Sequence, residues 1–204
     1  MKTTLYKWFR SVPVMGAVFR IVNAYAYLGD SKCHSLIAPL HLWWDRVFKK
    51  MVYVFIFTGA VFFLKESGVY GIEWEPSDSI LSIFPSILGF GIGAFALLFV
   101  MPSHFMDFIN GNKKKLNFGP EIILVDMAYP LLVYTMVMLL AGINKIYDYE
   151  YFKLFSAWAF FYGLAITLEL ISFLFNTSVM IRVVNANKDK KTRYTKRIWK
   201  GKER

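Results

Sequence analysis

Glu169 is the ionisable residue with the most unusual surroundings in this sequence, because it lies close to the middle of the apolar stretch 154–181. A carboxylate at the centre of a bilayer costs on the order of 3 kcal/mol, so it should be protonated, hydrogen-bonded or exposed to a wet cavity. Ser172 and Asn176 extend a polar stripe on the same helical face. The stripe indicates either a proton or ion path or an interhelical hydrogen-bond clamp. The clamp is favoured because we expect no Lys, Arg or His at the same depth.

Asp126 is a second acidic residue in apolar surroundings, at the entrance of the stretch 122–144. A helix amino terminus favours negative charge, so a capping or macrodipole role is the first interpretation. A contact with His104 is a geometric alternative. Asp126 and Glu169 are therefore the candidate intramembrane polar groups.

Basic residues are concentrated in a middle loop and in the tail 182–204. A basic cluster beside a membrane helix attracts anionic lipids at about 1 kcal/mol per residue, and an acidic protein partner is the alternative. Direct nucleic-acid binding is less favoured, because affinity for phosphate is common to any such patch. The candidate lipid-binding or partner-binding residues, including two aromatic ones in the tail, are Lys113, Lys114, Lys115, Lys190, Lys191, Arg193, Tyr194, Lys196, Arg197 and Trp199.

Residues for catalysis or metal binding do not form a recognisable motif. His34, His41, His104 and the single cysteine, Cys33, have none of the spacings of a zinc site. The sequence also contains no GxSxG elbow and no phosphate-cradling loop. We therefore predict no catalytic residue, no metal and no cofactor, and a protein that is not an enzyme.

The composition indicates which elements position these residues. Hydrophobic residues make up 56% of the 204 residues and aromatic residues 19%, more than a soluble domain of this length normally buries. We predict an all-α integral membrane protein with four transmembrane helices, at about 46–65, 79–106, 122–144 and 154–181. Residues 1–45 are predicted to form amphipathic helices at the cytoplasmic interface, which either lie in the headgroup layer or pack on a neighbouring subunit. Residues 182–204 are predicted to form a basic cytoplasmic tail that is mobile after residue 185. Lys49 and Lys50 are expected to snorkel to the headgroups.

Small residues recur every three or four positions in the second predicted crossing and lie on one helical face: Ser82, Ser86, Gly89, Gly93 and Ala96. Small side chains let another helix approach closely in a membrane. The favoured interpretation is packing within the four-helix bundle. Self-association of the chain and the lining of a pore are the alternatives.

The distribution of positive charge predicts the orientation. Segments 1–50, 107–121 and 182–204 hold 21 of the 24 Lys and Arg residues, whereas the loops 65–78 and 145–153 hold three. Loops rich in Lys and Arg remain on the cytoplasmic side. Both termini are therefore predicted to be cytoplasmic.

The chain resembles the small four-helix membrane components of bacterial anti-phage defence systems, and in particular KwaA, the membrane subunit of the Kiwa system. The resemblance rests on length, four crossings, the glycine-rich run 85–93 (PSILGFGIG) and the basic tail. It implies a homo-oligomer in the bacterial inner membrane, with a tetramer as the favoured assembly. It also implies a soluble DNA-binding partner similar to KwaB.

Two functions follow from these patterns. The first is a non-enzymatic, oligomeric inner-membrane sensor or scaffold that docks a soluble cytoplasmic effector through its basic face. The alternative is an oligomeric ion or proton pore that depolarises the membrane, with the small-residue face or the Glu169 stripe facing the axis.

Overall fold

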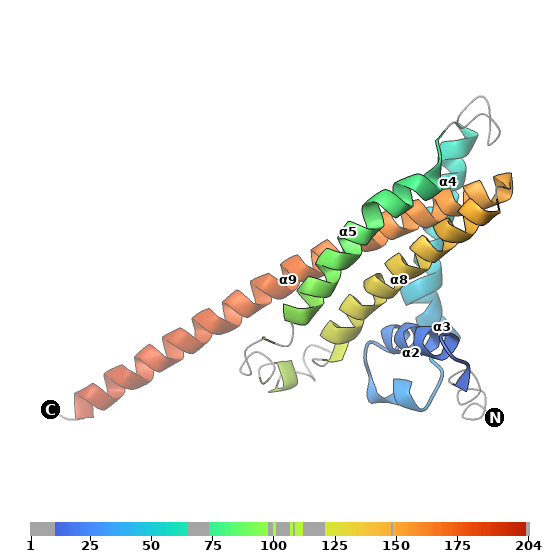
Figure 1. Cartoon of the computed structure of the whole chain (residues 1–204). Helices are drawn as coiled ribbons and strands as arrows, with labels where there is room; N and C mark the ends of the chain where they lie inside the picture. The colour runs from blue at the N-terminus through green and yellow to red at the C-terminus, as the bar shows by residue number, and fades with distance from the viewer. Residues whose placement is uncertain are drawn as a thin grey trace.

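The structure is a computed structural model in which every regular element of the described residues is helical. The described residues are 11–64, 74–97, 100, 107, 109–111, 121–147 and 149–202, and beyond residue 182 side chains are described only at residue 186. The all-α class is therefore confirmed over these ranges. The main elements are α2 (Met15–Ala26), η1 (Ser31–His34), α3 (Leu40–Trp43), the π-helix η2 (Trp44–Phe48), α4 (Lys49–Phe63), α5 (Pro76–Leu97), α8 (Glu121–Ile146) and α9 (Glu150–Lys202) (Figure 1).

Three of these helices are long and apolar enough to cross a membrane. They are Pro76–Leu97, Glu121–Ile146 and the part Tyr151–Arg182 of α9. They correspond to the second, third and fourth predicted crossings. The first predicted crossing corresponds to α4, whose 15 residues are too few to cross a bilayer alone. The predicted end of the second crossing, after Leu97, falls mostly outside the described residues.

Helix α9 differs from the prediction of a separate, mobile tail. It continues without a break through 53 residues to Lys202, well beyond the ends of its neighbours (Figure 1). The segment 183–202 contains no proline, and its only glycine, Gly201, lies at the end of the helix. Nothing in the sequence therefore stops the helix at the end of its apolar part.

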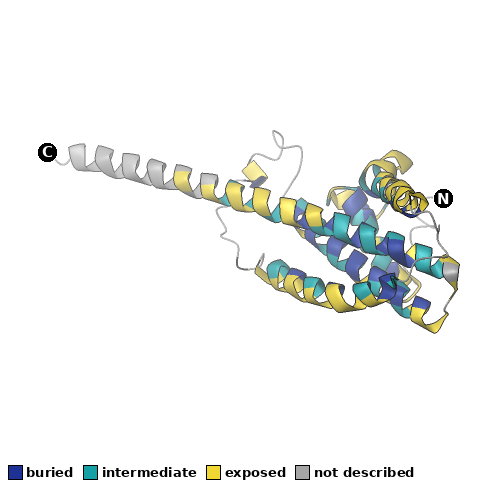
Figure 2. Ribbon diagram, turned by 90° about the horizontal axis from the view of Figure 1, so that it is seen from above, coloured by how far each residue is buried: buried dark blue, intermediate teal, exposed yellow. Residues whose placement is uncertain are grey.

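Helix α8 is central to the bundle and packs against α5, α9 and α2. Phe84 of α5 is fully buried with Tyr134 of α8, and the ring of Phe84 lies against Gly163 of α9. A Cβ atom at Gly163 would overlap that ring, and one at Gly91 would overlap Leu131 of α8. These two glycines therefore allow the close approach of α5 to α8 and α9, and buried residues line the contact (Figure 2).

The predicted small-residue face does not pack within the bundle. All five of its residues, Ser82, Ser86, Gly89, Gly93 and Ala96, are exposed. A Cβ atom at Gly89 or Gly93 would meet nothing within 4 Å. The interpretation as packing within the chain is therefore wrong, because α5 turns its opposite face, which includes Phe84 and Gly91, toward the other helices. Self-association and pore lining stay predictions.

The amino-terminal region is helical where it is described, and one buried amide holds it together. The side chain of Asn23 on α2 donates to the carbonyl oxygens of Cys33 (3.1 Å) and Leu36 (2.9 Å) and accepts from the backbone N–H of Ala38 (2.8 Å). These bonds satisfy backbone groups of the segment between α2 and α3. Cys33 is buried there, and burial raises the pKa of its thiol.

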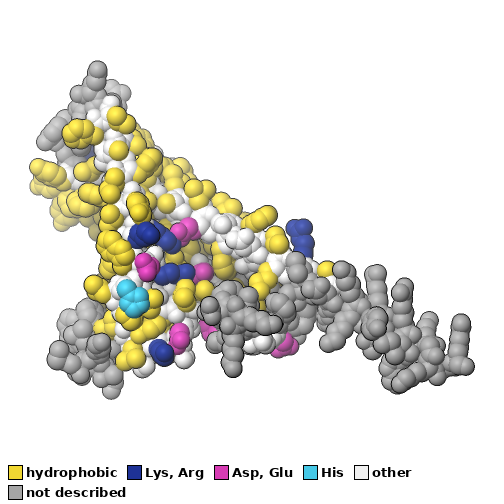
Figure 3. Space-filling model, turned by 180° about the vertical axis from the view of Figure 1, so that it is seen from behind, with side chains coloured by type: hydrophobic (Ala, Val, Ile, Leu, Met, Phe, Trp, Pro, Cys, Tyr) yellow, Lys and Arg dark blue, Asp and Glu magenta, His cyan; other side chains and the backbone are white. Residues whose placement is uncertain are grey.

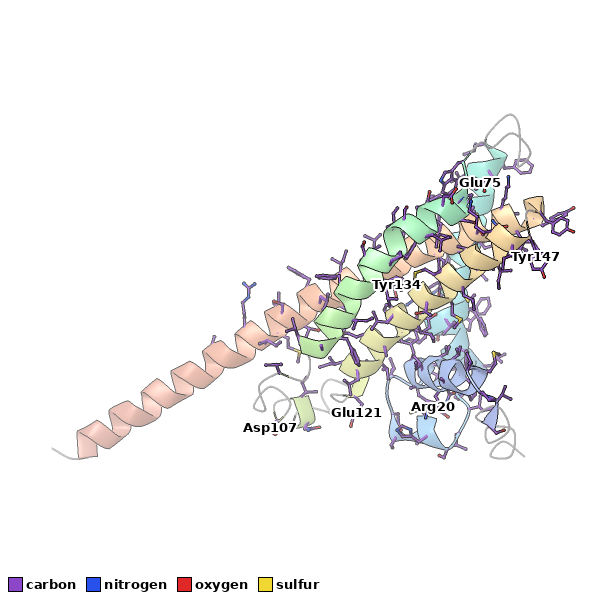
Figure 4. All side chains as sticks on the ribbon, in the orientation of Figure 1. Arg20, Glu75, Asp107, Glu121, Tyr134 and Tyr147 are labelled. Carbon is purple, nitrogen blue, oxygen red and sulfur yellow. The ribbon has the colours of Figure 1, made fainter. Side chains whose placement is uncertain are left out.

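The two ends of the bundle are distinct. Glu75 and Tyr147 mark one end, and Arg20, Asp107 and Glu121 mark the other (Figure 4). At the Tyr147 end, Asn144 of α8 donates to the hydroxyl of Ser77 of α5 (2.6 Å), and Ser77 contacts Ser156 of α9. This buried polar contact joins all three long helices.

Candidate functional site: an interhelical charge cluster

Two cations and two carboxylates meet where α2 and α4 join the bundle, and we call these four residues the charge cluster. Arg46 of η2 pairs with Asp126 of α8, and Lys50 of α4 pairs with Glu169 of α9 at 2.6 Å between Nζ and Oε2. The space-filling view shows basic and acidic side chains gathered beside a largely hydrophobic surface (Figure 3). The formal charges of the cluster cancel.

The partners of the two acidic residues overturn parts of the sequence-based interpretation. Glu169 has a cation at its own depth, because Lys50 reaches it from a helix 119 residues away. The favoured clamp between helices is therefore an ion pair. Asp126 is the sixth residue of α8, beyond the first turn in which the macrodipole acts, and its partner is Arg46. His104 lies outside the described residues.

Both cations come from one helical face. Arg46 and Lys50 are four residues apart, so their side chains project in similar directions. Arg46 lies within the π-helix η2, which joins α3 to α4 without interruption. π-helical turns are rare and are frequently found at functional sites. The π-helical part of this segment thus includes Arg46, one of the four residues of the charge cluster.

Three tyrosines form the base of the charge cluster. The ring of Tyr25 on α2 stacks on Tyr129 of α8, with centroids 3.9 Å apart and an interplanar angle of 5°. Arg46 lies over the other face of Tyr25, at 4.2 Å from Cζ to the centroid. The hydroxyl of Tyr25 accepts from Lys50 (2.8 Å), and the hydroxyls of Tyr129 and Tyr162 are 2.7 Å apart. Cation–π contacts of this kind add to the stability of the cluster.

Burial raises the pKa of the Tyr25 phenol above its usual range, although the nearby Arg46 cation opposes that shift. Its hydroxyl therefore stays protonated at neutral pH.

None of the three tyrosines was predicted as a site residue, because an aromatic residue in an apolar stretch normally belongs to the core. Only their hydroxyl groups distinguish them from phenylalanine in the sequence.

A cavity of about 240 Å³ adjoins the charge cluster. It is lined by Tyr25, Arg46, Lys50, Asp126, Pro130, Glu169, Leu170 and Phe173. Ser172 and Asn176 are exposed and do not line it. The predicted polar stripe therefore does not lead into this cavity, and Glu169 is its only member there.

The other candidate residues are not brought to this site by the described structure. Lys113, Lys114 and Lys115 lie outside the described residues. The tail candidates belong to α9, from Lys190 to Trp199, but only their backbone is described. Within the residues described, no group of three or more His, Cys, Asp or Glu side chains is arranged to hold a metal ion.

The arrangement of the charge cluster suits it to holding helices together. The side chains are only part-buried, so removing one partner leaves the other charge unpaired at a moderate cost in stability. The pairs join η2 and α4 to α8 and α9, and Tyr25 adds α2. Helix α2, the continuous segment η2–α4, α8 and α9 are thus held together at one point.

Comparison with known proteins adds no relative: no family model, curated protein or solved structure matches this chain. The fold itself defines the class, an all-helical protein over its described residues with three helices able to cross a membrane. The resemblance to the Kiwa membrane subunit stays a prediction.

A double-mutant cycle on Lys50→Met and Glu169→Gln measures the coupling of the ion pair. Each single variant should lower the stability, since it leaves its partner unpaired, and the double variant should lose less than the sum. We expect a coupling free energy of about 1 kcal/mol, at the lower end for contacting residues because Glu169 is part-exposed. Unfolding in lipid nanodiscs provides the measurement.

The matched control is the more exposed pair Lys145–Asp78 at the opposite end of the bundle, at 2.8 Å. The same cycle with Lys145→Met and Asp78→Asn should give a coupling below about 0.5 kcal/mol. Equal coupling in both pairs would show that the cluster is no stronger than an ordinary surface contact.

Proposed function

We propose that this chain is a non-enzymatic scaffold of the bacterial inner membrane that docks a soluble cytoplasmic protein. The observation that carries the proposal is the continuity of α9 from its apolar part into its basic part. The two carboxylates of the charge cluster are engaged by Arg46 and Lys50, which supports a structural use of these groups.

The proposal includes a fourth crossing. Helices α3, η2 and α4 follow one another without a gap over 40–63, which is 24 residues and about 36 Å at 1.5 Å per residue. Measured from Arg46 of the charge cluster to Phe63, this helical segment has 18 residues, a distance along the helix of about 26 Å, and snorkelling Lys side chains make up the difference to a hydrocarbon core of ~30 Å. Most residues of α4 are exposed and apolar, among them Phe55, Ile56 and Phe57. This surface supports contact with lipid.

The charge cluster then lies near one edge of the hydrocarbon layer. Glu169 is 18 residues along α9 from Tyr151, or about 27 Å, and Asp126 is 20 residues along α8 from Ile146, or about 30 Å. The middle of an apolar sequence is therefore not the middle of the membrane when the helix is longer than the bilayer is thick. Charges at an edge cost less than charges at the centre.

Both termini are proposed to be cytoplasmic. The described helix ends that lead into the segments with 21 of the 24 Lys and Arg residues lie at the Arg20 end of the bundle or extend from it, and the described helix ends that flank the two loops with the other three lie at the Tyr147 end. This arrangement agrees with the positive-inside rule.

Single-cysteine labelling tests this orientation in a Cys33→Ser background. An impermeant maleimide should label Tyr149→Cys in intact spheroplasts and Asn110→Cys only after lysis, since both positions are exposed but adjoin opposite ends. Labelling of both positions in intact spheroplasts, or of Asn110→Cys alone, would reject the proposed topology.

The distal part of α9 is proposed to be the docking element. It continues 20 residues past Arg182, or about 30 Å, and eight of those 20 residues are Lys or Arg. A helix that is continuous with a membrane span holds these charges at a defined distance from the lipid. The resemblance to KwaA supports an anti-phage setting with a KwaB-like partner, and that setting is part of the proposal.

Ala186→Pro tests whether helix continuity matters for docking, because proline inside a helix costs about 3 kcal/mol and removes no basic residue. Co-purification of cytoplasmic proteins with the tagged full chain should fall at least roughly tenfold, as it should after deletion of 186–204. The Ala186→Ser variant is the control and should retain its partners. Unchanged co-purification after the deletion would exclude the distal helix as a docking element.

Self-association through α5 is part of the proposal, and it also supports the alternative of a pore. The exposed small-residue face on α5 is the specific observation that favours both. The Glu169 stripe does not favour a pore, because Glu169 is paired with Lys50, and Ser172 and Asn176 do not line the cavity. The proposed oligomer is a tetramer, as the resemblance implies.

Leucine at Gly89 and Gly93 should weaken self-association in lipid, measured by energy transfer between labelled copies, because larger side chains prevent close helix contact. Gly59→Leu is the control, at an exposed glycine of α4 with nothing within 4 Å. Ion flux in liposomes separates the alternatives. Flux in the parent chain that the double variant abolishes would favour the pore, and no flux in the parent would remove it.

A further inference from the structure

An apolar groove between α4 and α8 has no part in the proposed docking function. Its volume is about 240 Å³. Met51 of α4 lines one side, and Trp158, Ala159 and Tyr162 of α9 form its floor. The opposite side is a stripe along α8 formed by Tyr129, Leu132, Val133, Met136, Val137 and Leu140.

The shape of the groove follows the direction of the helices. The lining stripe extends over 12 residues of α8, from Tyr129 to Leu140, a distance along the helix of about 16 Å. It lies within the membrane-spanning segment Glu121–Ile146. Helix α4 packs against α9, while α8 packs against α5, α9 and α2. The groove is the narrow space that this arrangement leaves between α4 and α8.

The polar atoms in the lining are already engaged. The hydroxyls of Tyr129 and Tyr162 bond to each other at 2.7 Å, and the indole N–H of Trp158 donates to the carbonyl oxygen of Met51 at 3.2 Å. A water molecule in a cavity needs two to four polar partners. The groove therefore favours an apolar occupant.

The groove is continuous with the surface that faces lipid. Phe55 lies one turn after Met51 on α4, Leu139 precedes Leu140 on α8, and both are more than half exposed. Val18 and Val22 of α2 also line the groove. An acyl chain entering between α4 and α8 would thus extend as far as the amino-terminal helix.

We propose that this groove binds one acyl chain of a membrane phospholipid. Filling it restores dispersion contacts that the lining residues lack when the groove is empty. The two methionines, Met51 and Met136, have flexible side chains that adapt to such an occupant. The bound chain also supports α2 through Val18 and Val22. This proposal rests on the membrane-spanning helices and not on the docking of a partner.

Photo-cross-linking tests the proposal in the full chain, reconstituted in vesicles of a phospholipid that carries a diazirine in the middle of one acyl chain. Peptide mapping should find cross-links on groove residues such as Met136 and Leu132. The Met136→Trp variant should reduce the groove cross-links several-fold by filling the space. Leu139→Trp, three residues further along the same helix and absent from the groove lining, should leave them unchanged.

Native mass spectrometry identifies the occupant after purification in mild detergent. We expect one retained phospholipid per chain in the parent and in Leu139→Trp, and less in Met136→Trp. Cross-links confined to exposed residues such as Leu139 and Phe55 would overturn the proposal, and so would retention of detergent or free fatty acid only. If Met136→Trp does not fold, the cross-link map of the parent chain decides alone. None of these readouts depends on a soluble partner.

Discussion

The pairing of two cations with two carboxylates between helices is the constraint on which the arrangement of the bundle depends. In these part-buried surroundings, neither Arg46 nor Lys50 can move away from its carboxylate without leaving a charge unpaired. A shift of α4 by one helical turn would separate both pairs at once. The charge cluster thus determines the register of α4 against α8 and α9, where apolar contacts alone would allow several positions.

The aromatic base of the cluster makes the amino-terminal region part of the same unit. Tyr25 is stacked between Arg46 and Tyr129, so α2 is positioned by contacts with both α8 and the segment before α4. Asn23 lies two residues earlier on the same helix and holds the chain segment that leads to α3. Local folding of residues 23–38 and packing of the long helices therefore support each other.

The long apolar helices could be predicted from sequence because their signal is local, and Glu169 and Asp126 could be singled out as charges in apolar stretches. Their partners could not. Arg46 and Lys50 occupy a basic helix end, where a side chain that snorkels to the headgroups has the same sequence pattern as one that forms an ion pair.

The small-residue face of α5 was located correctly, but its packing against the other helices of the chain was predicted wrongly, because periodicity identifies a face without showing what it contacts. The continuity of α9 was missed because a change in composition at Arg182 resembles a boundary, although helix geometry needs none.

An uninterrupted α9 also behaves mechanically as a lever. Its membrane part is fixed by Gly163 against Phe84 and by Glu169 against Lys50, and its distal part extends about 30 Å beyond Arg182. A change in helix tilt of about 10° inside the bilayer would move the far end by about 5 Å, given that length. A small rearrangement of the part of α9 within the bundle would therefore become a displacement of several ångströms at its distal end.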